Sequence, residues 1–436
     1  MATPIILDTD PGIDDTLATL LALASPELDV RAITLVHGNT RVLNSAKNII
    51  TLMSILEQQI QYSAESGAED SRKFSTSHPV IAVGVYHSRP YCKGTVNTFR
   101  HTGAEKPLES EQVFADYFHG IDGLGELHTT HPEFTPSDWQ SLIQAEKAVV
   151  ADVKAHLHTN SLPAKPRLFT TTSRPAVEEI LHQLREAPAH TITIVAIGPL
   201  TNLAQAIRRE PATFSRVKRV LILGGAIDVP GNTTPHAEFN FLADPHAAQI
   251  VLQASHGFVP GEVGAAARAK AVSEGNEAPV HVTLVPLDAA EQSSKIPYSI
   301  YLMHLLPLTT PLSRFTSTIM AYAYDVCIRR FGVDYMAVYD AFAMSLVVDL
   351  TKSELTLAED GWSAEGMGWS SQFMDVRVET EGTLTRGMCC RDRRVGPNRV
   401  WPGNAHNVEV IVAGDHKRFL NRFMERVFDV VLEQVQ

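Results

Sequence analysis

Four carboxylates lie close together near the start of the chain, at Asp8, Asp10, Asp14 and Asp15. Asp8 and Asp10 follow the apolar run at residues 5–7 and have the spacing that puts both side chains on one face of a strand. Pro11-Gly12 then breaks the strand, and Asp14 and Asp15 open a helical pattern, where helix N–H groups favour negative charge. One such Asp would be explained as part of a helix start. Four repel one another unless a cation lies among them, and an all-oxygen cluster suits calcium or magnesium.

The composition of the whole chain restricts its class. The 436 residues are 44% hydrophobic and 20% charged, as in globular proteins, and the net charge of −12 argues against nucleic acid or an anionic membrane as partner. The apolar runs are too short to span a bilayer, and the chain enters a strand pattern almost at once, so we expect no signal peptide. The four cysteines, Cys92, Cys327, Cys389 and Cys390, have no metal-binding spacing. These features predict a cytoplasmic protein with free thiols.

Strand and helix patterns alternate along the chain, which predicts an α/β fold with a mostly parallel, Rossmann-like sheet and helices on both faces. Buried strands are expected near residues 5–7, 30–35, 80–83, 191–197, 220–223, 280–286 and 408–412, and an antiparallel pair within 373–388. Helices are expected at 42–59, 145–157, 176–184, 247–252, 312–330, 341–349 and 416–432. No linker or repeat divides the chain, so we predict one domain over residues 1–436, with insertions near 61–78, 129–165 and 255–279.

Further polar residues follow other predicted strands, at the sheet edge where ligands bind in open α/β proteins. Asn39 follows the second strand, Ile197-Gly198 ends a later one, and a loop over residues 224–240 carries Asn232, Glu238 and Asn240. Each has a plain alternative: Asn39 as a turn residue, Glu238 and Asn240 as part of a helix approach, and Asp340 as the cap of a helix from Ala341. Their convergence at one edge favours a ligand site.

These motifs, in this order, resemble the inosine-uridine nucleoside hydrolases from residue 4 to about residue 430. The resemblance is carried by Asp10-x-x-x-Asp14-Asp15, Gly38-Asn39, Gly198-Pro199-Leu200-Thr201-Asn202, Gly224-Gly225, Asn232 with Glu238-Phe239-Asn240, and Asp340. The opening Asp-x-Asp also resembles, more weakly, the haloacid dehalogenase-type phosphatases. Those enzymes are not expected to carry the Glu-Phe-Asn segment or the late Asp, and they typically have Thr or Val where Gly12 stands.

The resemblance to nucleoside hydrolases implies a calcium-dependent enzyme that cleaves the N-glycosidic bond of ribonucleosides, giving ribose and free base. It implies calcium ligands in the carboxylates of Asp10, Asp15 and Asp340 and the backbone carbonyl of Ile197, with Asp8 in support. The residues implied to bind the substrate, mainly through its ribose hydroxyls, are Asp14, Asn39, Asn232, Glu238, Asn240 and Asp340. Asp10 is implied to activate the attacking water at the metal. The small-molecule partner would be a ribonucleoside, and the resemblance suggests a homodimer or homotetramer.

Tyr339 departs from the family pattern, because many members have His at this place, where it helps protonate the departing base. A phenol, with an ordinary pKa of about 10, is a weaker acid near neutrality. Tyr339 and His119 are our candidates for the leaving-group acid, with Tyr335 and His236 as further possibilities. Because of this departure, an alternative is a non-catalytic protein of the same fold that binds a nucleoside or a ribose-like ligand. The sequence does not choose the base.

Overall fold

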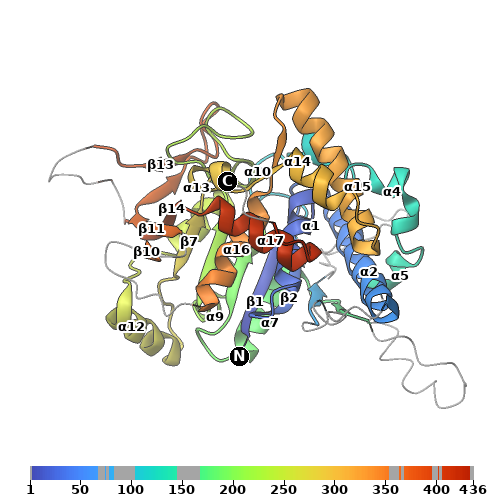
Figure 1. Cartoon of the computed structure of the whole chain (residues 1–436). Helices are drawn as coiled ribbons and strands as arrows, with labels where there is room; N and C mark the ends of the chain where they lie inside the picture. The colour runs from blue at the N-terminus through green and yellow to red at the C-terminus, as the bar shows by residue number, and fades with distance from the viewer. Residues whose placement is uncertain are drawn as a thin grey trace, which may run out of the picture.

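A single sheet of ten strands forms the centre of the molecule, with the order β10-β11-β14-β7-β6-β5-β1-β2-β3-β4 (Figure 1). The computed structural model describes residues 2–66, 74, 78–82, 104–144, 167–352, 363–364, 368–394, 401 and 405–432. The strands are β1 (Thr3–Thr9), β2 (Leu28–Leu35), β3 (Val80–Ala82), β4 (Thr170–Thr172), β5 (Thr193–Ala196), β6 (Arg219–Leu223), β7 (Val282–Val285), β10 (Ser363–Ala364), β11 (Trp369–Met374) and β14 (Val408–Ala413). Pairing is parallel from β14 to β4, while β11 and β10 add antiparallel strands at one edge. The predicted mostly parallel sheet is confirmed.

The sheet reverses its winding direction between β1 and β5. From β1 the chain proceeds through β2, β3 and β4 on one side, whereas β5, β6, β7 and β14 extend on the other side. Asp8 in β1 is in register with Ala196 in β5, and Thr9 is in register with Leu35 in β2. The residues that follow these strands therefore meet where the winding reverses, which is the usual ligand position in such sheets.

Helices cover both faces of the sheet, as predicted (Figure 1). One face carries α1 (Ile13–Leu23), α2 (Val42–Ser66), α15 (Pro311–Val326), α16 (Tyr339–Lys352) and α17 (His416–Phe428). The other face carries α7 (Ala176–Glu186), α8 (Thr201–Arg209) and α11 (Pro245–Gln253). Successive side chains of β1 divide between the two cores, since Ile5 and Leu7 belong to the first and Ile6 to the second. This alternation fixes which face each strand residue serves.

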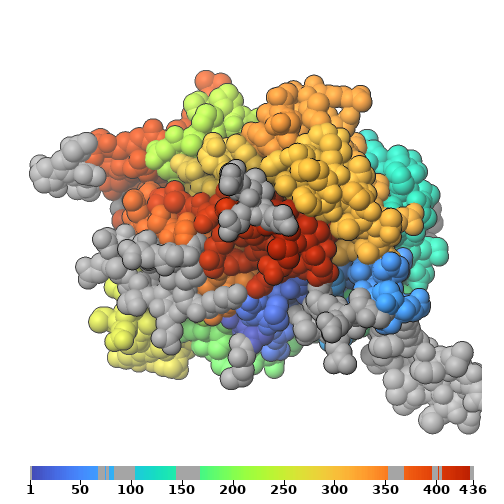
Figure 2. All heavy atoms as spheres, in the orientation of Figure 1, coloured from blue at the N-terminus to red at the C-terminus, as the bar shows by residue number. Residues whose placement is uncertain are grey.

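The first and last parts of the chain share a face. In the space-filling view the red α17 lies against blue N-terminal atoms and beside the yellow and orange helices (Figure 2). Arg426 of α17 forms an ion pair of 2.7 Å with Glu27, next to β2. This ion pair joins the C-terminal helix to the turn that leads into β2.

The remaining helices and strands complete the chain. They are α3 (Asp116–His119), α4 (Leu127–Thr130), η1 (Pro132–Phe134), α5 (Trp139–Gln144), α9 (Pro211–Phe214), α10 (Phe239–Ala243), α12 (Gly261–Ser273), α13 (Leu287–Ser293), β8 (Lys295–Pro297), α14 (Tyr298–Ile300), η3 (Tyr301–Leu305), η4 (Cys327–Phe331), β9 (Tyr335–Ala337), β12 (Val376–Val378) and β13 (Cys389–Arg391). β8 pairs with β9 and β12 with β13, both antiparallel. The second pair matches the antiparallel pair predicted within residues 373–388 only in part, because Phe373 belongs to β11 and β13 begins at Cys389, after the predicted range.

Several predicted boundaries were wrong; the C-terminal helix, for example, ends at Phe428 and not at residue 432. Helix α2 continues to Ser66, beyond the predicted end at Gln59, because no Gly or Pro interrupts the pattern and Gln61 donates to Glu65 one turn later at 2.8 Å. Helix α16 starts at Tyr339 rather than at Ala341, so Asp340 lies in its first turn. The segment predicted as an insertion at 255–279 contains α12, and the helix predicted within 129–165, at 145–157, lies outside the described residues. Within the described chain, no helix combines the length and apolar character needed to cross a membrane.

Candidate active site

Three buried carboxylates form the floor of the candidate site. Ligand atoms of Asp14, Asp15 and Asp340 all lie within 4.8 Å of one another. Asp14 and Asp15 belong to the first turn of α1, and Asp340 belongs to the first turn of α16. The two helices pack in the same core, so residues more than 300 positions apart in sequence meet at their N-termini. Both helix starts favour the negative charge gathered there.

Asp15 ties the ends of two strands to the start of α1. Its carboxylate accepts hydrogen bonds from Thr9 Oγ1 at 2.6 Å, from the Gly12 backbone N–H at 3.1 Å and from Asn39 Nδ2 at 2.7 Å. Thr9 ends β1, and Asn39 follows β2. This arrangement brings the acidic turn and Asn39 together, as the strand-end argument predicts.

Asp10 lies fully buried beside the cluster, between Gly38 and Gly198. A Cβ at either glycine would overlap its carboxylate. The Oδ2 atom accepts the Asn39 backbone N–H at 2.6 Å, whereas Oδ1 has no hydrogen-bond partner among the described residues. Burial, and then the charge of Asp15, raise the pKa of Asp10 well above its ordinary value. A buried oxygen without a donor is the kind of atom that a cation or a water proton satisfies.

Burial also raises the pKa of the other acids of the site. Burial first, and then the charge of Asp15, raise the pKa of Asp14 to about 8. Burial and the charge of Asp14 raise the pKa of Asp340 well above its ordinary range. Asp8, beneath them, has its pKa raised by burial to about 7 although Thr34 and Asn202 donate to its carboxylate. These carboxylates cannot all be charged without a compensating cation, and their oxygens suit a hard divalent ion.

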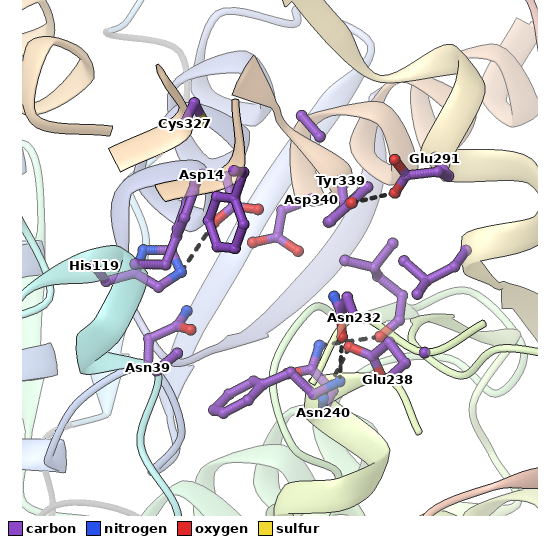
Figure 3. A pocket seen from close by; sticks show the side chains of 18 of the residues that line it. Asp14, Asn39, His119, Asn232, Glu238, Asn240, Glu291, Cys327, Tyr339 and Asp340 are labelled. Atoms are coloured by element: carbon purple, nitrogen blue, oxygen red, sulfur yellow. Dashed lines mark hydrogen bonds and ion pairs between the residues drawn. The ribbon is translucent and has the colours of Figure 1, made fainter. Parts of the chain in front are cut away.

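A cavity of about 500 Å³ opens above the carboxylates (Figure 3). Its polar lining comprises Asp14, Asn39, His119, Asn232, Glu238, Asn240, Glu291, Tyr339 and Asp340. Most of the remaining lining is apolar or aromatic and includes Phe118, Leu223, Val229, Phe239, Leu287, Phe331 and Tyr335. All the substrate-binding residues predicted from the sequence thus lie at one cavity, together with the backbone of Ile197. Asp10 and Asp15 lie below the lining.

The amide and carboxylate side of the cavity is held by α10. Glu238 caps this helix, accepting from the backbone N–H groups of Asn240 at 2.8 Å and Phe241 at 3.1 Å, and from that of Gly225 at 2.8 Å. Burial raises the pKa of Glu238, although the hydrogen bonds from these donors act to lower it. Asn240 Nδ2 donates to the Ile197 carbonyl at 3.0 Å, which places the predicted carbonyl ligand beside a predicted ribose-binding amide. The helix-cap explanation of Glu238 is therefore true and compatible with ligand binding.

His119 is held as a neutral ring. The backbone N–H of Ile13, the first residue of α1, donates to His119 Nδ1 at 3.1 Å, so the ring proton is on Nε2. His119 Nε2 lies 3.8 Å from Asp14 Oδ1. Burial lowers the pKa of His119 to about 3. At neutral pH this side chain is therefore not a cationic acid.

Tyr339 gives its hydroxyl hydrogen to Glu291 in a short hydrogen bond (Figure 3). Burial, and then the Glu291 carboxylate, raise the pKa of Tyr339 well above its ordinary value. Of the two further acid candidates, Tyr335 lines the cavity, whereas His236 is exposed on the turn before α10 and is not among the lining residues.

Glu291 is a site residue that we did not predict. It lies on α13, which begins two residues after the end of β7. Asn39 was predicted because polar residues that follow a strand lie at the ligand-binding edge of the sheet. The same reasoning applies to the residues after β7, so the sequence offered a signal for Glu291. Glu291 comes more than one helical turn after the strand, however, and matches none of the motifs of the resemblance.

Comparison with known proteins shows the family to which the chain is similar. A family model described as inosine-uridine preferring nucleoside hydrolase matches residues 5–421. The pyrimidine-specific ribonucleoside hydrolase RihA of Salmonella arizonae is 27% identical over 429 residues, covering 98% of this chain and 99% of the relative. RihA of Escherichia coli O9:H4 is 28% identical over 427 residues, with the same coverage of the two chains.

Solved structures share the fold. A plant nucleoside hydrolase, PpNRh1, superposes with a TM-score of 0.63 at 24% identity, covering 98% of this chain and 99% of its own. An inosine-guanosine nucleoside hydrolase gives a TM-score of 0.64 at 24% identity, covering 99% of this chain and 100% of its own.

Proposed function

Because this chain belongs to the inosine-uridine preferring nucleoside hydrolase family and is thus a ribonucleoside N-glycosidic hydrolase, we propose that its reaction depends on calcium held at the acidic cluster. The family match also removes the phosphatase alternative that the Asp-x-Asp opening had left. The observation that carries the proposal is the placement of Asp14, Asp15 and Asp340 within 4.8 Å, beside the unpartnered Oδ1 of Asp10 and at the floor of the cavity.

The proposed calcium ligands are the carboxylates of Asp10, Asp15 and Asp340 and the carbonyl of Ile197. Asp14 lies in the same carboxylate cluster and, with Asn39, Asn232, Glu238 and Asn240, is assigned to the hydroxyl groups of ribose. Carboxylates and amides that clamp these hydroxyls would be left without partners by a 2′-deoxy sugar. A 2′-deoxynucleoside is therefore expected to be a poor substrate.

Asp10 is the proposed general base. Bound calcium would supply positive charge that lowers the pKa of an attacking water. The Asp10 carboxylate takes the proton of that water as the water oxygen bonds to the anomeric carbon. The bonding pair of the N-glycosidic bond leaves with the base, which takes up a proton from solvent water to give the free base. Calcium bound beside Asp10 would keep this buried carboxylate ionised and so able to accept the proton.

We propose that neither His119 nor Tyr339 protonates the leaving base directly. His119 is neutral, and Tyr339 directs its hydrogen to Glu291. Tyr339 precedes Asp340 in the first turn of α16. Its proposed role is to hold that turn, and with it the Asp340 carboxylate, in place.

A substrate panel tests the function. Inosine, uridine and p-nitrophenyl riboside are incubated with the protein and calcium, and released ribose is measured as reducing sugar, with 2′-deoxyinosine as the matched control. Release of ribose from the ribonucleosides and little release from the deoxy analogue are expected. No release from any of the three ribosides would contradict the proposed activity.

A further inference from the structure

The Tyr339–Glu291 pair gives the largely apolar part of the cavity a polar element. Both side chains line the cavity, together with Leu287 one turn earlier on α13 and Tyr335 on β9. In Figure 3 the pair lies on the other side of Asp340 from His119 and Asn39. No lysine or arginine belongs to the lining formed by the described residues. The pair is thus apart from Asn39, whereas Asn232, Glu238 and Asn240 lie on its own side of Asp340.

The hydrogen-bonding capacity of this pair is one-sided. Tyr339 has one hydrogen, which it donates to Glu291 Oε2, so its oxygen can only accept a further bond. An ionised Glu291 carboxylate has no hydrogen at all, and its other oxygen can also only accept. A substrate group placed against the pair must therefore be a donor.

Purine and pyrimidine bases differ in what they would offer at such a place. Adenine and cytosine carry an exocyclic amino group, a donor, where hypoxanthine and uracil carry a carbonyl oxygen, an acceptor. A carbonyl oxygen facing two acceptors is repelled and leaves buried lone pairs without partners. An amino group satisfies them.

We infer that the Tyr339–Glu291 pair selects nucleosides whose base presents an exocyclic amino group. The inference rests on the proposed function, because it needs the sugar to be held over the acidic cluster. It assigns Glu291 as a specificity-determining residue. The flat base would pack against aromatic and aliphatic lining residues such as Phe118, Phe331 and Leu287.

The test uses two matched substrate pairs, adenosine with inosine and cytidine with uridine. For each pair the amino-to-carbonyl ratio of kcat/KM is measured in the wild type and in Glu291→Gln. The glutamine amide keeps an oxygen for the Tyr339 hydroxyl and turns N–H donors toward the cavity. Because the two bases also differ as leaving groups, the change in the ratio between enzymes is decisive. In Glu291→Gln, the amino-to-carbonyl ratio of kcat/KM is expected to be about tenfold or more below that of the wild type. This is the usual effect of leaving one buried polar group unpaired.

A control variant of matched chemistry is Glu262→Gln on α12, an exposed position away from the cavity, which should leave both ratios unchanged. A ratio unaffected by Glu291→Gln, or equal losses on both members of each pair, would overturn the inference, since Glu291 would then act on the sugar or on the fold. If Glu291→Gln does not fold, Tyr339→Phe removes one of the acceptors and should lower the same ratios.

Failure of the proposed function gives a different result. If the wild type cleaves none of the four nucleosides, binding is measured by calorimetry with cytidine and uridine. Tighter binding of cytidine that is lost in Glu291→Gln supports the inference without catalysis. Equal binding of the two contradicts it.

Discussion

Asn39 donates its backbone N–H to Asp10 Oδ2 at 2.6 Å, and its side-chain amide donates to Asp15 Oδ2 at 2.7 Å. A single residue in the loop that follows β2, Asn39, thus fixes the positions of two carboxylates that follow β1. One oxygen of Asp10 is held in this way, and the other has no partner among the described residues. That asymmetry suits a group that must accept a proton or a cation on a defined side.

Asp10→Asn is expected to fold but to lose nearly all turnover. The amide occupies the same space between Gly38 and Gly198, but it accepts no proton from water and is a poorer calcium ligand. Loss of a general base alone lowers kcat by about 10²–10⁴-fold. Ribose release under saturating uridine measures the effect, with the exposed Asp325→Asn as control. Retention of more than about a tenth of wild-type kcat would place the base elsewhere.

His119→Ala is expected to lower cleavage of inosine and of p-nitrophenyl riboside together. The neutral ring accepts the N–H at the start of α1, so its loss disturbs the acidic turn rather than the protonation of the base. His119→Asn offers an oxygen to the same N–H and should recover most of the activity on both substrates.

The contrast between these substrates separates the two roles of His119. Nitrophenolate leaves without protonation, so loss of a leaving-group acid would spare p-nitrophenyl riboside. A selective loss on inosine in both variants would show that His119 is the acid.

The calcium-free protein should lose stability as pH rises. The folded-state pKa of Asp14 is about 8, above the ordinary value of 3.8 expected when unfolded. A raised pKa contributes stability that is complete below about pH 4 and is lost as pH rises through about 8. In chelator, the melting temperature of the wild type should therefore fall between pH 5 and 8.5 by about a few degrees more than that of Asp14→Asn.

Adding calcium should abolish this difference at the upper end of the range, because the ion offsets the crowded negative charge. Parallel melting curves of wild type and Asp14→Asn in chelator would count against the assignment of Asp14 to the crowded cluster.

The part of the site that could be predicted from the sequence follows from strand ends and local motifs. Asp10, Asp14, Asp15 and Asn39 could be placed together because β1 and β2 are neighbouring parallel strands whose carboxyl ends meet. Asp340 could be placed only by family resemblance, since nothing local shows that α16 packs its first turn against α1.

The Tyr339–Glu291 contact could not be predicted, because it depends on how α13 and α16 pack at the edge of the sheet. The same limit applies to the neutral state of His119. Its cause is burial, and the Ile13 N–H that the ring accepts lies 106 residues away in the chain, so no spacing rule reveals this environment.

The central claim is that the buried carboxylates hold calcium that the reaction needs. The most direct measurement follows calcium content and ribose release from uridine on one sample, purified without chelator and then titrated with EGTA. The account predicts about one calcium per chain, from the oxygen-rich ligand set. It also predicts that activity falls in proportion to the calcium removed and returns when calcium is added back. Full activity in metal-free protein, or zinc in place of calcium, would contradict it.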